Sequence, residues 1–146
     1  MCSFAYSWNK AGGLKTYRLP SNRLVTYAPD AAGRTATVVS GSTTYASLQT
    51  GADPANGAAG LAGYAAHGGM QRLALGNGLI ERTGYNNRLQ PVSIQLGQVG
   101  SPQSVSGLGI FYCANLQSNC NDNNGSVQSQ TISPAGVTET YNYDRL

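Results

Sequence analysis

The feature that most constrains the fold is a tyrosine that recurs at steps of 18 to 31 residues, several times just before a turn. The series consists of Tyr6, Tyr27, Tyr45, Tyr64, Tyr85, Tyr112 and Tyr143. Four of these tyrosines precede turn-like segments (SWNKAGG, APDAAG, AAHGG and NN), and a run of roughly alternating polarity follows each turn. A strand of about six residues, a turn and a return strand together use about 20 residues. The recurrence therefore predicts successive β-hairpins built from an internal repeat.

Turn signals divide the chain into short strands. GNG at 76–78 and NNG at 123–125 easily reach positive φ, and SPAG at 133–136 fits a type I or II turn. The predicted strands cover residues 3–8, 14–19, 23–28, 34–40, 43–48, 60–66, 70–75, 79–85, 89–96, 105–113, 126–132 and 137–143. No helix is predicted, and the longer polar segments 49–60, 97–107 and 115–125 are predicted to be loops.

The composition agrees with an all-β fold. Charged residues make up 10% of the 146 residues, against about 25% in a typical soluble domain, and Gly, Ser, Thr, Asn and Gln take their place. A hydrophobic fraction of 40% predicts a core. The formal net charge of +3 comes from scattered side chains without the basic run of a nucleic-acid surface. No segment reaches the roughly 18 apolar residues of a membrane span.

The three cysteines leave two alternatives open. Cys113 and Cys120 flank the segment ANLQSN, so they could close a small disulfide loop in an exported protein or remain free thiols. Cys2 is then the odd cysteine. Because the sequence has no CxxC pair and one histidine, neither a metal site nor a cofactor is predicted.

Several blocks of the sequence resemble the RHS/YD-repeat family. These blocks are YAPDAAGR, LGNGLIERTGYNNRLQPVSIQLG, NNGSVQSQTI and the final YNYDRL. A repeat of that family has a Tyr-Asp pair, a turn with Gly-Arg and a following strand. The resemblance covers nearly the whole chain and falls on Tyr27, Asp30, Gly33 and Arg34, on Tyr64 and Gly68, on Tyr85, Asn87 and Arg88, and on Tyr143, Asp144 and Arg145.

The resemblance implies consecutive antiparallel β-hairpins in a twisted, spiralling sheet. In bacterial members of the family such a sheet forms a hollow shell around a toxin, and in related animal adhesion proteins it lies outside the cell. A structural, non-enzymatic role and a secreted or cell-surface location are therefore implied. The aspartyl self-cleavage motif of the bacterial shells is not found, and the nearest match, around Asp53, lies in a mid-chain loop.

Twelve short strands are too few to enclose a folded toxin. We therefore expect residues 1–146 to form a single repeat unit of a longer array, or a unit that associates with copies of itself. In both cases the open sheet edges would pair with further strands. An enclosed toxin and surface glycans are the other expected partners, and neither a nucleic-acid partner nor a membrane span is expected.

The physical chemistry of the motif explains a scaffold without any catalysis. A tyrosine ring packs against cross-strand neighbours while its hydroxyl reaches solvent or a backbone group. The glycine adopts the positive φ of the turn, and the aspartate accepts hydrogen bonds from turn N–H groups. The arginine is predicted to stack on a tyrosine ring of the next repeat.

Other functions find less support in the sequence. His67 lies in a turn, and the carboxylates Asp30, Asp53, Asp122, Asp144, Glu81 and Glu139 are dispersed in the chain. Neither GNG nor AGG begins a helix, as a phosphate-binding loop would. No catalytic residue is predicted. The alternative function is a carbohydrate-binding surface, on which Trp8 and exposed tyrosines would stack against sugars.

Overall fold

A computed structural model describes the chain except for residues 1–2, 49–50, 54–57, 62, 118–119 and 145–146. The described part is all-β apart from one short 3-10 turn, η1 (Ala114–Leu116). The strands are β1 (Ala5–Trp8), β2 (Leu14–Arg18), β3 (Leu24–Pro29), β4 (Thr35–Ser40), β5 (Thr43–Leu48), β6 (Gly51–Asp53), β7 (Ala58–Leu61), β8 (Arg72–Leu75), β9 (Ile80–Tyr85), β10 (Pro91–Gln98), β11 (Ser101–Phe111), β12 (Ser129–Ser133) and β13 (Val137–Thr140).

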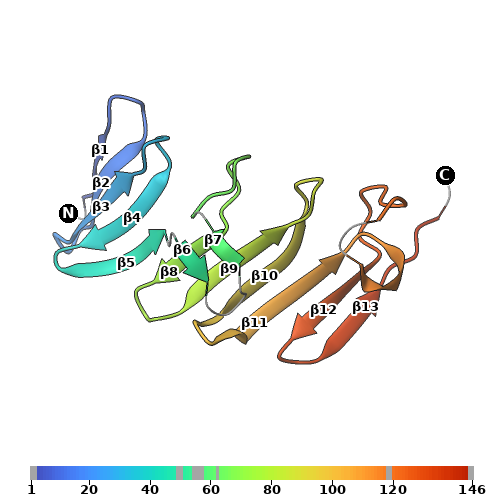
Figure 1. Cartoon of the computed structure of the whole chain (residues 1–146). Coiled ribbons are helices and arrows are strands. Elements are labelled where there is room, and N and C mark those ends of the chain that lie inside the picture. The colour runs from blue at the N-terminus through green and yellow to red at the C-terminus, as the bar shows by residue number, and fades with distance from the viewer. Residues whose placement is uncertain (1–2, 49–50, 54–57, 62, 118–119, 145–146) are drawn as a thin grey trace.

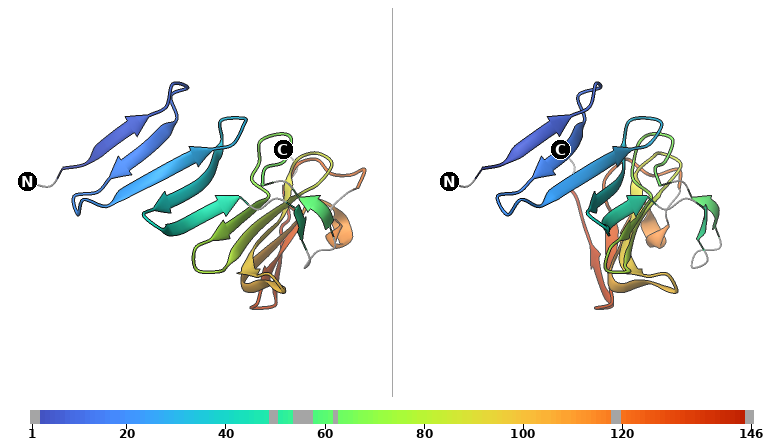
Figure 2. Two further views of the ribbon diagram at one scale, coloured as in Figure 1. Left: turned by 60° about the vertical axis from the view of Figure 1, so that its left-hand side comes forward. Right: turned by 90° about the vertical axis from the view of Figure 1, so that its left-hand side faces the viewer.

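Eleven of these strands form one antiparallel sheet in the order β1-β2-β3-β4-β5-β8-β9-β10-β11-β12-β13. Strand order follows chain order, so the sheet is a succession of hairpins that runs from one end of the molecule to the other (Figure 1). The strands turn steadily from β1 to β13 in Figure 2, as twisted sheets do. The predicted all-β class and its consecutive hairpins are confirmed. Within the described residues the sheet is open and does not curl into a spiral, so β1 and β13 are free edges.

The sheet is a single layer, and for this reason its core is small. Among the described residues, the buried apolar side chains are Ile80, Tyr112 and Cys113. The core that a 40% hydrophobic fraction predicts is therefore limited to a few residues. Most strand residues are half-buried, because a one-layer sheet has no second layer to cover its face.

Two segments depart from the main sheet at the same end of the strands. Between β5 and β8 the chain forms the small hairpin β6–β7 and then a bridge between Tyr64 and Met70, while β5 pairs directly with β8. The prediction of a strand at 60–66 in the main sheet is therefore wrong, and the predicted loop 49–60 contains β6 and part of β7. Between β11 and β12 lie η1 and irregular chain, where the predicted loop 115–125 falls.

The predicted loop at 97–107 is also wrong. β10 and β11 continue through this segment and are joined by a tight turn, with Gln98 opposite Ser101. Small and polar side chains gave no strand signal there, but backbone pairing decides the structure. A Cβ on Gly97 would lie 2.2 Å from the carbonyl oxygen of Ser101, so the glycine permits this close approach of the two strands.

In the part of the chain that the structure describes, no helix has the length and apolar character needed to cross a bilayer.

Candidate functional site

Six turns of the described structure share one backbone design. In each, the first residue accepts a hydrogen bond from the N–H of the fourth residue and donates its own N–H to the carbonyl of the fifth. The fourth residue has a positive φ, which makes this the three-residue hairpin loop built on a type I turn. The described turns of this kind have Gly12, Asn22, Gly33, Gly68, Gly78 and Leu89 as their fourth residue, with φ of 81°, 66°, 79°, 91°, 84° and 63°.

The spacing of these turns defines the repeat. Gly12 and Gly33 are 21 positions apart, and so are Gly68 and Leu89. Each pair lies at the same end of the strands, because one strand, a turn and a return strand separate its members. We call this end, which carries the turns 9–13, 30–34, 65–69 and 86–90, the tyrosine end of the sheet.

Side chains reinforce three of the turns at the tyrosine end. The Oδ1 atoms of Asn9, Asp30 and Asn86 each accept two backbone N–H hydrogen bonds, from the third and fifth residues of the turn, at 2.8–3.0 Å. Such Asx turns hold the backbone in the turn conformation. The resemblance to the family motif falls on Asn87, but the residue that caps the turn is Asn86, which is buried. The signal that could have found it is its position directly after Tyr85.

Asp30 has a second partner in its own turn. Its Oδ2 accepts hydrogen bonds from the Arg34 guanidinium, 2.9 Å from Nε and 2.7 Å from the second nitrogen. The side-chain hydrogen bond from Arg34, and then the backbone hydrogen bonds from Arg34 and Ala32, lower the pKa of Asp30 below its ordinary value of 3.8. The carboxylate therefore stays charged and holds both the turn and Arg34 in place.

Three tyrosines make one and the same hydrogen bond. The hydroxyl of Tyr64 donates to the carbonyl of Thr35 at 2.9 Å, that of Tyr85 to Met70 at 3.0 Å, and that of Tyr143 to Val127 at 2.7 Å. Each acceptor lies two positions after a glycine with positive φ, namely Gly33, Gly68 and Gly125. We call Tyr64, Tyr85 and Tyr143 the tyrosine ladder. Each member ties the end of one hairpin to the turn before it.

The tyrosine rings are also held from the preceding turn. The Arg34 guanidinium lies over the Tyr64 ring, 4.3 Å from its centroid, as the sequence predicts for an arginine and the next repeat. In the next turn Gly69 takes the place of the arginine, and a Cβ there would lie 2.6 Å from the Tyr85 hydroxyl. His67 contacts the Tyr85 ring edge-on at 4.6 Å. This contact gives the histidine a structural role.

One tyrosine of the predicted motif lies elsewhere in the fold. Tyr27 is not part of the ladder, because it lies inside β3 opposite Val38, and Pro29 stands at the position before the turn. Asp144 follows Tyr143 directly, as Asn86 follows Tyr85. Arg145 lies outside the described residues.

The Cys113–Cys120 disulfide closes the irregular segment after β11, with Cα atoms 6.0 Å apart. This segment returns to the turn 86–90. Asn123 donates from Nδ2 to the Gln90 side chain at 2.7 Å, and its carbonyl accepts a hydrogen bond from Arg88. Arg88 therefore links the turn 86–90 to this irregular segment, rather than stacking on a tyrosine. Although Cys113, Cys120 and Asp122 lie within 4.8 Å of one another, the disulfide leaves no thiolate to bind a metal.

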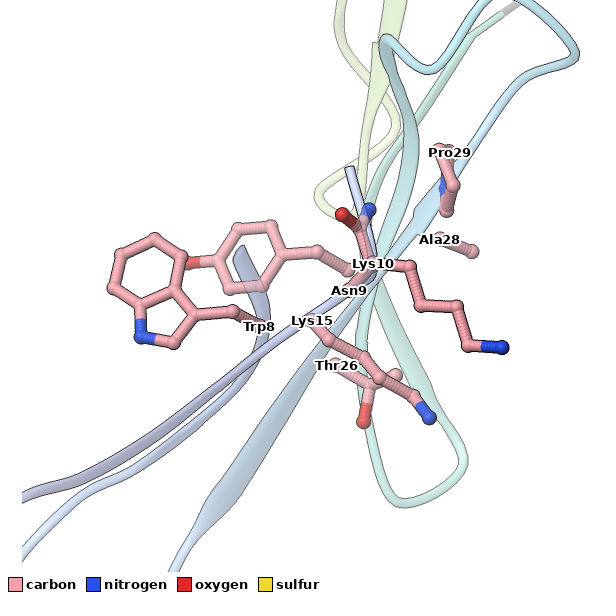
Figure 3. A pocket seen from close by; sticks show the side chains of 8 residues that line it. Trp8, Asn9, Lys10, Lys15, Thr26, Ala28 and Pro29 are labelled. Carbon is pink, nitrogen blue, oxygen red and sulfur yellow. The ribbon is translucent and has the colours of Figure 1, made fainter. Parts of the chain in front are cut away.

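Exposed aromatic side chains gather on β1 and directly before it. Phe4, Tyr6 and Trp8 are 53%, 57% and 63% exposed. Tyr6 and Phe4 both stack on Tyr17, with ring centroids 5.2 and 5.9 Å apart. Trp8 also lines an open pocket of about 480 Å³ between the first hairpin and β3 (Figure 3).

Together these features define an open, single-layer repeat sheet whose hairpins are joined by tyrosines.

No protein-family model matches the chain, and no curated protein matches it. Solved structures share its fold at low sequence identity. The crystal structure of TcdB2-TccC3 without its hypervariable C-terminal region matches 90% of this chain with a TM-score of 0.65 and 17% identity. The structures of TcdB2-TccC3-Cdc42 and TcdB2-TccC3-TEV match the same share with TM-scores of 0.63 and 0.62 and identities of 17% and 16%. The chain spans 5% of the length of these proteins.

Proposed function

We propose that this chain is a structural scaffold, a segment of an RHS/YD-repeat wall that works outside the cell and carries out no catalysis. The observation that carries the proposal is the tyrosine ladder: three tyrosines repeat one hydrogen bond from hairpin to hairpin. Such a bond couples neighbouring repeats, and repeat proteins gain their stability from nearest-neighbour contacts of this kind.

The resemblance of the sequence to RHS/YD repeats and the fold shared with TcdB2-TccC3 chains support the same proposal. The likeness to the TcdB2-TccC3 chains is consistent with an RHS-like fold. A single layer with so few buried side chains also suits a wall that continues beyond its own strands. The partners that we propose are further strands of the same type at the open edges, and a toxin enclosed by a longer array.

The free edge of β13 provides a direct test. The N–H of Tyr141 donates to the carbonyl of Gln128, the residue directly before β12. Because backbone groups alternate along a strand, the N–H of Glu139 also faces β12, whereas that of Thr138 faces the free edge. Thr138→Pro therefore removes an outward donor and keeps the bonds to β12, and Glu139→Pro removes an inward one.

We expect the molar mass of the unaltered chain, measured by light scattering, to rise with concentration. Thr138→Pro should shift this rise to higher concentration without changing the circular-dichroism spectrum. Glu139→Pro is the matched control: because it removes a hydrogen bond to β12, it should reduce the thermal stability of the sheet, which Thr138→Pro should not. A strictly monomeric chain at high concentration would contradict the edge-pairing that the proposal requires.

The second candidate function is a carbohydrate-binding surface, which the exposure of Phe4, Tyr6 and Trp8 favours. Aromatic faces provide apolar stacking surfaces. A glycan array separates the two functions. Selective binding that is lost in Trp8→Ala and kept in Tyr143→Ala, at the other edge of the sheet, would favour carbohydrate recognition. Absence of selective binding would leave the scaffold as the function.

A further inference from the structure

In the described structure, the first turn of the tyrosine end, 9–13, has no ladder tyrosine packed against it, whereas the turns 30–34 and 65–69 each contact a tyrosine of the ladder. Tyr64 lies against the turn 30–34, and Tyr85 against the turn 65–69. For the turn 9–13, the corresponding residue is the one directly before the turn 30–34, and this is Pro29. A proline has no ring hydroxyl and no long side chain, so it cannot repeat the contact of the ladder.

The two strands between the turns 9–13 and 30–34 separate toward the tyrosine end. β2 and β3 pair through three positions, from Arg18 opposite Leu24 to Thr16 opposite Thr26. β3 continues to Pro29 through its pairing with β4, and β2 begins at Leu14 through its pairing with β1. The pocket of about 480 Å³ lies where the pairing between β2 and β3 has ended. Its volume is within the range of small-ligand pockets, roughly 300–1,000 Å³.

The lining of the pocket combines aromatic and basic side chains. Trp8, Asn9, Lys10 and Lys15 contribute from the first hairpin, and Thr26, Tyr27, Ala28 and Pro29 from β3. In Figure 3 the Trp8 indole lies on one side of the pocket, and Lys10, Ala28 and Pro29 lie on the other. Two ammonium groups border it, and the nearby Asp30 carboxylate is already bound to Arg34.

We propose that this pocket is a vacant ladder position that binds a tyrosine followed by an acidic residue, carried by an extended segment of another chain. The phenol ring would lie against Trp8 and Tyr27, two aromatic side chains that line the pocket. The carboxylate of the following residue complements Lys10 and Lys15. The molecule itself contains such a pair in Tyr143 and Asp144, the first of which makes the ladder contact in its own chain.

The pocket can be tested directly because Trp8 is the single tryptophan of the chain. The probe is the blocked dipeptide N-acetyl-Tyr-Asp-amide, added to the full chain while Trp8 fluorescence is recorded. We expect a saturable change. N-acetyl-Phe-Asp-amide, which lacks the hydroxyl, and N-acetyl-Tyr-Lys-amide, which reverses the charge, should bind more weakly. A lost exposed ion pair corresponds to an affinity reduction of up to about fivefold.

Two variants test the location of the binding. Pro29→Tyr places a tyrosine at the ladder position from within the chain, so it should raise Tm and weaken probe binding by about tenfold or more. Lys10→Glu keeps Pro29 and should weaken N-acetyl-Tyr-Asp-amide and strengthen N-acetyl-Tyr-Lys-amide. This exchange of preference is independent of whether Pro29→Tyr folds.

Three outcomes would overturn the proposal. They are the absence of a saturable signal with the Tyr-Asp probe, equal binding of the three dipeptides, and unchanged binding in both variants. Saturation by N-acetylglucosamine oligomers with no response to the dipeptides would instead assign the pocket to sugars.

Discussion

The hydroxyl groups of the tyrosine ladder should contribute measurable stability. Tyr64→Phe removes the 2.9 Å hydrogen bond to the Thr35 carbonyl and keeps the ring under Arg34. A hydrogen bond contributes roughly 0.5–1.5 kcal/mol net, and this one is solvent-accessible, so about 0.5–1 kcal/mol is expected. For a chain of this size the corresponding decrease in Tm is roughly 1–4 °C. Tyr85→Phe, which removes the 3.0 Å bond to Met70, should cost a similar amount.

The chain supplies a matched control for the hydroxyl. Tyr45 also lies under an arginine, with Arg23 4.6 Å from its ring centroid. Within the described structure its hydroxyl makes no hydrogen bond, so Tyr45→Phe should leave Tm almost unchanged. Urea unfolding followed by circular dichroism measures all three variants. Equal effects of Tyr64→Phe and Tyr45→Phe would refute the idea that the ladder hydroxyl couples the repeats.

The ring contributes separately from the hydroxyl. A double-mutant cycle of Arg34→Ala and Tyr64→Ala isolates the contact between guanidinium and ring, and an exposed cation–π pair gives roughly 0.5–1 kcal/mol. Arg34 also binds Asp30, so the cycle is repeated in an Asp30→Asn background. A coupling energy near zero in both backgrounds would show that the contact between guanidinium and ring does not couple the repeats.

Three further predictions concern the turns and the disulfide. The pKa of Asp30 is lowered in the folded chain. The stability that the Asp30 carboxylate gives to the fold is therefore complete well above pH 4, and is lost as the pH falls below 3.8 through the folded-state pKa. Asp30→Asn should flatten this part of a curve of Tm against pH. Replacing both Cys113 and Cys120 by serine should cost about 2–3 kcal/mol in urea unfolding, the loop-closure estimate for their separation of seven, and an unchanged midpoint would contradict it. Gly33→Ala should destabilise the fold by about 1 kcal/mol, because φ is 79° there, although the added methyl meets no atom within 4 Å. Leu89→Gly, at the same turn position with φ of 63°, should stabilise the fold by up to about 1 kcal/mol. If both substitutions changed the free energy of unfolding in the same direction, the common turn geometry would be refuted.

Strand positions were predictable wherever a turn signal and an alternating run agreed. The observed β5 (Thr43–Leu48) has its predicted bounds, and β9 (Ile80–Tyr85) differs by one residue. The segment 97–107 failed because glycines and small polar side chains carry no alternation, although the backbone still pairs. The segment 60–66 failed because local sequence cannot show that β5 pairs with β8 and leaves β7 outside the main sheet.

The candidate site was predictable in kind and less so in its residues. A glycine or asparagine with positive φ is specified by local sterics, and an arginine beside a repeated tyrosine is a local pattern. The capping role of Asn86 instead of Asn87, and the absence of Tyr27 from the ladder, depend on which residue occupies the first position of each turn. Moving the first position of a turn by one or two residues leaves the composition unchanged, but it changes which side chain makes the hydrogen bonds.

By itself, the sequence determined that this chain is a series of tyrosine-punctuated hairpins, because turn geometry and strand alternation are set by neighbouring residues. The tertiary structure alone decided that the hairpins form one open layer with a small core. It alone also decided which tyrosines bind the preceding turn, and that Pro29 lines an open pocket beside the first hairpin. The physical reason is that these contacts join residues of different hairpins, up to 29 positions apart in the ladder, and depend on the register of the strands between them.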